Sequence, residues 1–176
     1  MKRFYLLFLA IFILAACQEN QPEDNTLDDE SLLAGVSNKK EEVTIGEIKP
    51  RLTVMYEAAK LSLTRREVLN PNLSGVKIEK IVLRSDGDDW PVVMDVHYLD
   101  SLTNPKTTYY FHHRKLLAVE KPSGNYIFKN DKLQVWTDEN WDPLKNKTAE
   151  MWLDQENILL KNAKKFLNTF EIKYEE

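Results

Sequence analysis

Cysteine and glycine are scarce in this chain of 176 residues. Cys17 is its one cysteine, so no disulfide can form within a molecule. The five glycines form neither the Gly-x-x-x-x-Gly-Lys nor the Gly-x-Gly-x-x-Gly loop that cradles phosphate groups. The His-Glu-x-x-His helix of zinc proteases and the Gly-x-Ser-x-Gly turn of hydrolases are missing too. No motif therefore points to an enzyme, and no cofactor is predicted.

Positive charge is in deficit as well. Lysine and arginine number 24 against 28 aspartates and glutamates, a net charge of −4. A protein whose main partner is nucleic acid or anionic lipid carries a basic surface. Neither is expected as the main partner here.

The first residues have the pattern of an export signal. Lys2 and Arg3 are followed by residues 4–16, all of them apolar or aromatic. This order is typical of a secretory signal peptide. The run is shorter than the roughly 17–25 apolar residues that span a bilayer. Residues 1–16 are therefore predicted to be read and removed.

The residues Leu14-Ala15-Ala16-Cys17 resemble the lipobox of bacterial lipoproteins. The resemblance implies cleavage before Cys17, a diacylglyceryl group on its sulfur and acylation of the new amino group. Several acyl chains anchor a protein firmly, because each buried CH₂ contributes about 0.8 kcal/mol. The next residues, Gln18-Glu19-Asn20, resemble signals that send lipoproteins of the Bacteroidetes group to the outer leaflet. We expect a protein of the cell envelope, attached in a Gram-negative cell to the outer rather than the inner membrane.

The rest of the chain divides by composition. Residues 17–42 are rich in Gln, Glu, Asn, Asp and Ser and bury too little apolar surface to fold. They are predicted to be a lipidated, flexible tether. Residues 43–176 contain the periodic apolar patterns and are predicted to form a single domain.

A helix is predicted over residues 43–69, followed by a turn at Asn70-Pro71-Asn72. Thr44 and Glu47 have the spacing of a capping box, but that start places Pro50 inside the helix. A start near Lys49 places Pro50 in the first turn instead. With either start, one face of the helix collects Leu52, Met55, Tyr56, Ala59 and Leu63.

Alternating apolar residues and short polar turns then predict an antiparallel meander of five or six strands. The predicted strands are 76–83, 92–100, 107–113, 116–120, 126–129 and 133–137. The segment Tyr109–Leu116 recurs, offset by 17, as Tyr126–Leu133. Two successive hairpins that need the same turn chemistry explain this repeat better than a repeated ligand element.

Asp142 and Pro143 have the pattern of a helix start, and an amphipathic helix is predicted to follow and to pack on the sheet. Its apolar positions are Met151, Trp152, Ile158, Leu159, Ala163, Phe166, Leu167 and Phe170. The predicted fold class is α+β: an N-terminal helix, the meander and a long C-terminal helix. The Tyr-x-Phe strand, polar turn, Lys-Leu strand and closing helix over residues 107–170 resemble small bacterial lipoproteins, a resemblance that implies no activity.

The histidines suggest one candidate site. If residues 101–106 close a hairpin, Asp95 lies opposite His112 and His97 opposite Tyr110. Residues two apart share a face, so these four side chains would form one polar patch. Asp95, His97 and His112 could then ligate a metal or act as acid and base. The simpler interpretation is the solvent-facing side of a half-buried sheet.

The tryptophans suggest another site. Trp90 follows the acidic turn at 86–89, and Trp141 lies between Asn140 and Asp142. Exposed aromatic rings near carboxylates and amides can stack on sugars or anchor a protein interface. Core packing is the alternative, and it is expected for Trp136 and Trp152.

Three functions remain open. The favoured one is a non-enzymatic, envelope-anchored interaction module whose partner is an envelope or exported protein. The second is a carbohydrate-binding accessory lipoprotein that uses Trp90 and Trp141. The third is a metal-dependent enzyme that uses Asp95, His97 and His112.

Overall fold

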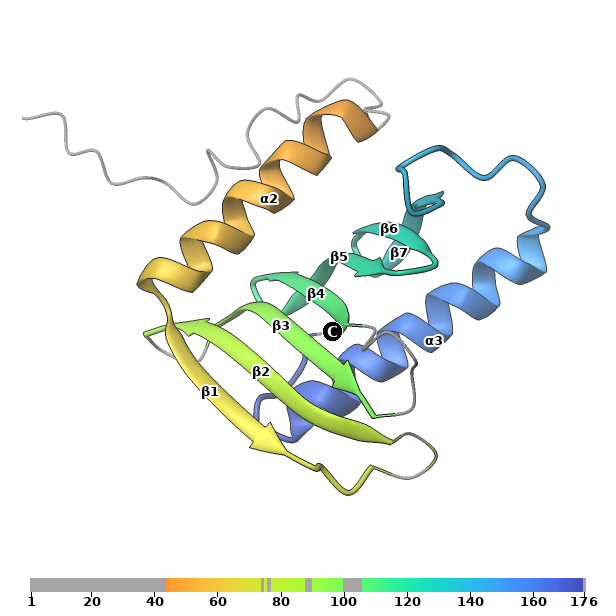
Figure 1. Cartoon of the computed structure of the whole chain (residues 1–176). Helices are drawn as coiled ribbons and strands as arrows, with labels where there is room; N and C mark the ends of the chain where they lie inside the picture. The colour runs from red at the N-terminus through yellow and green to blue at the C-terminus, as the bar shows by residue number, and fades with distance from the viewer. Residues whose placement is uncertain (1–43, 74, 76, 88–89, 100–105, 176) are drawn as a thin grey trace, which may run out of the picture. The chain divides into compact units, whose positions relative to one another are not determined.

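The computed structural model describes residues 44–73, 75, 77–87, 90–99 and 106–175 (Figure 1). The predicted leader and tether, with Cys17, lie outside these residues. The chain divides into two units, residues 1–41 and 42–176, and every described element belongs to the second. Within the described ranges, no helix is both long and apolar enough to cross a bilayer.

The domain is an antiparallel sheet with a helix before it and a helix after it, which confirms the α+β class. The sheet has seven strands in the order β1-β2-β3-β4-β5-β6-β7, so each strand pairs with its neighbours in sequence. The bounds are β1 Thr64–Leu69, β2 Ile78–Asp86, β3 Trp90–Tyr98, β4 Lys106–His112, β5 Lys115–Lys121, β6 Gly124–Lys129 and β7 Lys132–Thr137. Seven strands replace the predicted five or six.

The additional strand is β1, which the sequence pattern assigns to the first helix. Helix α2 runs from Ile45 to Ser62 and ends before β1. The β1 sequence TRREVL is rich in residues that also favour helices. Pairing with β2 overrides that preference, because Val68 lies opposite Ile81 and packs against the apolar cluster between the sheet and the C-terminal helix. The prediction of a helix as far as residue 69 was wrong for this reason.

Helix α2 begins at Ile45, close to the predicted start at Thr44 and not near Lys49. Thr44 occupies the cap position, but its side chain makes no capping hydrogen bond. Pro50 lies inside the helix, where it lacks the N–H that would bond to the carbonyl of Gly46. The predicted apolar face is confirmed: Leu52 and Ala59 are buried, and Met55, Tyr56 and Leu63 pack beside them.

Each face of the sheet has its own apolar cluster. On one face, Tyr109 and Phe111 pack against Leu159 and Phe166 of helix α3, Ala149–Asn168. On the other face, called the α2 face below, α2 packs with the following residues: Val93, Tyr110, Ala118, Ile127 and Trp141. Because a helix covers each face, β4 is buried at successive positions, with Tyr109 and Phe111 facing α3 and Tyr110 facing α2.

The sequence repeat corresponds to two matching turns. His113 and Arg114 between β4 and β5 have φ angles of 48° and 61°. Asn130 and Asp131 between β6 and β7 have φ angles of 50° and 59°. Two positive φ values in a two-residue loop are typical of the type I′ hairpin turn. The interpretation of the repeat as shared turn chemistry is confirmed.

The start of the last helix was predicted too early. Helix α3 begins after Thr148, whose side chain accepts a hydrogen bond of 3.2 Å from the amide of Met151. Pro143 instead forms a β-bridge with Thr137. Leu159, Ala163, Phe166, Leu167 and Phe170 are buried as predicted, whereas Met151 and Ile158 face solvent.

Candidate functional site

Asp95 lies at the centre of the α2 face and is only 2 % exposed. It pairs with Val82 of β2 and Thr108 of β4. Tyr56 of α2 reaches down to it, which places the carboxylate between the helix and the sheet. A buried carboxylate is costly unless cations and hydrogen bonds surround it.

Four side chains meet this carboxylate. Oδ2 accepts hydrogen bonds from Arg84 at 2.9 Å and from the Tyr56 hydroxyl at 3.1 Å. Oδ1 accepts one from Thr108 at 2.9 Å and lies 3.3 Å from Nζ of Lys106. That ammonium also donates to the Tyr56 hydroxyl at 2.9 Å and sits 4.4 Å from the centre of its ring.

The charges of Asp95 and Lys106 each favour the ionised form of the other. Burial on its own raises the pKa of Asp95, but the charge of Lys106 and the hydrogen bonds from Thr108 and Arg84 outweigh it and hold the pKa below its ordinary value. Burial likewise lowers the pKa of Lys106, whereas the bond to Tyr56 and the charge of Asp95 raise it overall. Asp95 is ionised and saturated with donors, so its role is to fasten α2 to the sheet.

The predicted hairpin register was wrong. Asp95 lies opposite Thr108, four positions earlier on β4 than the predicted His112. His97 lies opposite Lys106 rather than Tyr110. Strand β4 begins at Lys106, a residue that the prediction assigns to the loop. The even offset keeps every side chain on its predicted face, but it separates the two histidines.

The predicted metal ligands are therefore not brought together. His112 lies at the far end of β4, opposite Lys115, with its ring stacked 3.9 Å from that of His113. Within the described part of the chain, no group of three His, Cys, Asp or Glu side chains is arranged to hold a metal ion.

The two candidate tryptophans have different surroundings. Trp90 is 38 % exposed, with the Arg114 guanidinium 4.7 Å from its ring centre and His113 against it edge-on. Trp141, predicted to be exposed, is only 8 % exposed and belongs to the core under α2. Trp136 and Trp152 pack against the other cluster, as expected. Of Trp90 and Trp141, only Trp90 is exposed, so the two rings cannot both stack on one sugar.

The two outer edges of the sheet differ. The C-terminal end of the β7 edge is covered by the following segment, where Pro143 bridges to Thr137 and the amide of Leu144 donates to the carbonyl of Trp136 at 3.1 Å. Strand β1 forms the other edge, and no described strand pairs with its outer side. Four of its six residues are exposed, and the other two, Arg66 and Val68, are half-buried.

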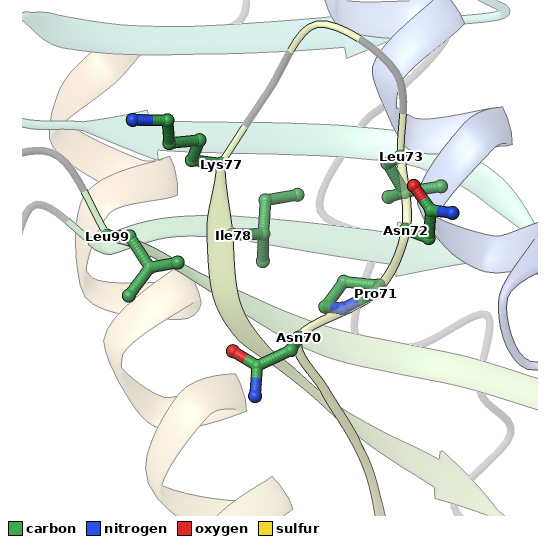
Figure 2. Close-up of a pocket in the computed structure, with 7 residues that line it drawn as sticks. All are labelled: Asn70, Pro71, Asn72, Leu73, Lys77, Ile78 and Leu99. Carbon is green, nitrogen blue, oxygen red and sulfur yellow. The ribbon is translucent and has the colours of Figure 1, made fainter.

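A shallow depression lies at the end of β1. It has a volume of about 330 Å³ and is lined by Asn70, Pro71, Asn72, Leu73, Lys77, Ile78 and Leu99. Figure 2 shows Ile78 and Leu73 directed toward each other across the depression, whereas Lys77 points to the opposite side of its strand. Leu99, which lines the depression, is 53 % exposed, and Leu69 at the end of β1 is 65 % exposed.

Sequence reasoning selected Asp95 but missed its partners. The strand register places Arg84, Lys106 and Thr108 near Asp95. The packing of α2 on the sheet places Tyr56 there. The one available signal was Tyr56 itself, a polar-tipped ring on the apolar face of α2. Such a hydroxyl normally finds a hydrogen-bond partner when it is buried.

No protein-family model, curated protein or solved structure matches the chain significantly.

Proposed function

We propose that this chain is a lipid-anchored, non-enzymatic binding module of the bacterial envelope. Its partner is another envelope or exported protein, and an extended segment of that partner adds to the sheet beside β1. The lipid on Cys17 holds the module at the membrane.

The unequal edges of the sheet carry this proposal. A strand at an edge presents a row of N–H and C=O groups that another chain can pair with. The C-terminal end of the β7 edge is covered by a segment that contains Pro143, and this proline has no N–H to offer a further strand. The β1 edge has no such cover among the described residues. Strand addition is a common way to bind an extended peptide.

The direction of the β1 amides can be worked out. The amide of Asn70 donates to the carbonyl of Glu79 on β2 at 2.8 Å. Strand β1 pairs with β2 without a register shift, and successive residues of a strand direct their backbone groups to opposite sides. The amides of Leu69, Glu67 and Arg65 therefore point outward, toward an added strand.

The depression supplies specificity. Backbone bonds give an added strand its affinity, while pockets for its side chains select its sequence. The apolar part of the depression suits one apolar side chain of the segment. Strand β1 carries Arg65 and Arg66 against the single acidic residue Glu67, which favours a segment with acidic residues.

A proline substitution tests the proposal. Glu67→Pro removes an outward amide without removing a bond to β2, and edge strands tolerate proline on their solvent side. Glu67→Ala is the matched control, because it removes the same carboxylate and keeps the amide. Intact cells that express each form are crosslinked, and the anchored protein is purified.

The wild-type and Glu67→Ala forms are expected to co-purify one dominant envelope or exported protein, and Glu67→Pro is expected to lose it. Circular dichroism of the purified Glu67→Pro protein checks that the fold persists. A folded Glu67→Pro form that retains the partner would refute strand addition. The absence of any dominant partner in all three samples would refute the interaction module.

A further inference from the structure

We propose that Lys80, His97 and Lys106 form a binding site for a phosphate group on the α2 face of the sheet. The site shares Lys106 with the cluster around Asp95 and does not use the β1 edge. Its ligand is either a small soluble phosphate or the headgroup of an anionic phospholipid.

The three residues form a row across three strands. Lys80 of β2 lies opposite His97 of β3, and His97 lies opposite Lys106 of β4. Directly opposed residues share a face and have Cβ atoms about 4.5–5.5 Å apart. His97 is two residues beyond Asp95, so the row lies on the α2 face. Two flexible ammonium groups and a ring nitrogen can therefore reach one anion between them.

The row is accessible, unlike the carboxylate beside it. Lys80, His97 and Lys106 are each half-buried, whereas Asp95 is 2 % exposed. The stems of the lysines thus lie along the sheet while their charges remain within reach of solvent.

The local charge balance favours an anion. Asp95 already pairs with both Arg84 and Lys106, so its charge is fully used. Among the described residues, no ion pair or hydrogen bond holds the ammonium of Lys80. Arg84 and Lys106 carry two positive charges against the one carboxylate of Asp95, and Lys80 adds a third nearby, so a bound anion would offset the excess.

His97 makes the site sensitive to pH. Charged groups face it from three strands: Glu79 and Lys80 of β2, Asp95 of β3 and Lys106 of β4. Burial and the charges of Lys80 and Lys106 lower the pKa of His97 below 6.5, although Asp95 and Glu79 act in the opposite direction. The ring is neutral at pH 7, and its protonation at lower pH adds a charge to the row. A bound phosphate raises the His97 pKa by the same linkage.

The test uses the full-length chain with Cys17→Ser. Inorganic phosphate is titrated at constant ionic strength while the ring signal of His97 is followed by NMR. Lys80→Gln removes one charge of the row, and Lys129→Gln removes an exposed charge at the end of β6 as the matched control. In a parallel arm, vesicles of phosphatidylglycerol are compared with vesicles of phosphatidylcholine.

Phosphate is expected to raise the His97 pKa, because the anion binds the protonated ring more tightly. Lys80→Gln is expected to weaken binding about fivefold, the loss typical of one partly exposed charge contact, while Lys129→Gln leaves it unchanged. A response to phosphatidylglycerol vesicles alone that depends on Lys80 assigns the phosphate to a lipid headgroup. No response in either arm, or equal losses in the two variants, overturns the site.

Discussion

Tyr56 of α2 donates a 3.1 Å hydrogen bond to the Asp95 carboxylate of β3, 39 positions further along the chain. This bond joins the first helix to the middle of the sheet. The same carboxylate forms ion pairs with both Arg84 and Lys106, so helix, sheet and local charge depend on one buried group. Its removal leaves two cations without their counter-ion.

Asp95→Asn is therefore expected to destabilise the domain by about 3–5 kcal/mol, the loss typical of breaking a buried ion pair from one side. Chemical denaturation of the purified protein measures the change. Glu57→Gln, at an exposed ion pair of α2, is the control, and we expect a change within about 0.5 kcal/mol. Equal effects of the two substitutions would show that the Asp95 cluster does not fasten α2 to the sheet.

Asp95 also predicts how stability depends on acid. Its pKa in the folded state is lowered from 3.8, so the stabilisation is complete above the unfolded value and is lost as pH falls through the folded one. The wild-type protein is expected to lose stability below about pH 4. Thermal unfolding between pH 2 and pH 7 measures this loss, and Asp95→Asn should flatten the curve in that window. An unaltered curve would contradict the assignment.

The sequence predicts which residues share a face of the sheet, but the expectation that the Asp95 face is solvent-facing was wrong, because α2 covers it. The register was also predicted poorly. Alternation alone places Tyr109 and Phe111 on one side and Asp95 on the other, and the structure agrees. Register depends on where the loop begins, and a shift by an even number of residues preserves the alternation. The pattern therefore carried no signal that could separate Thr108 from His112 as the partner of Asp95.

Edge strand β1 was not predictable for a different reason. Its charged residues protect an edge from unwanted pairing, and the same residues also favour a helix. Only contact with β2 decides between the two conformations. The proposed binding edge is thus the strand that the sequence pattern predicts as helix.

Gly124 is the position where an added side chain is least tolerated. Its φ angle is +144°, and a Cβ atom there would press against the carbonyl oxygen of Thr137. Gly124→Ala is expected to cost about 2 kcal/mol or more, from backbone strain and the clash together. Gly46→Ala in α2 meets nothing within 4 Å and should be neutral or stabilising by up to about 1 kcal/mol. Thermal unfolding compares them, and similar midpoints would contradict the turn geometry.

Tyr174 ties the C-terminal segment to two hairpins. Its hydroxyl accepts a 2.8 Å bond from the amide of Leu116 and donates to the carboxylate of Asp131. Tyr174→Phe is expected to destabilise the domain by about 1–2 kcal/mol, because two buried or half-buried groups lose a partner. Lys173→Ala, at an exposed neighbour, is the control. Denaturant midpoints that coincide for the two variants would show that this tie contributes nothing.

Cys17 tests the lipid anchor. Cys17→Ser is expected to abolish acylation and to move the protein from the membrane fraction to the soluble fraction of the envelope, because the acyl chains supply the attachment. Gln18→Ala serves as the control and should remain with the membrane. Mass spectrometry of the native N-terminus accompanies the fractionation. Unchanged attachment of Cys17→Ser, or an unprocessed Met1 terminus, would contradict the anchor.

Site-specific photo-crosslinking at the β1 edge tests the account most directly. A photo-reactive amino acid replaces Leu69, 65 % exposed on β1, or Leu153, 53 % exposed on α3, in the anchored protein of living cells. We predict one dominant adduct with an envelope or exported protein from position 69 and none with that protein from position 153. The same adducts from both positions, or an adduct from position 69 only with this chain's own N-terminal segment, would contradict a partner strand at β1.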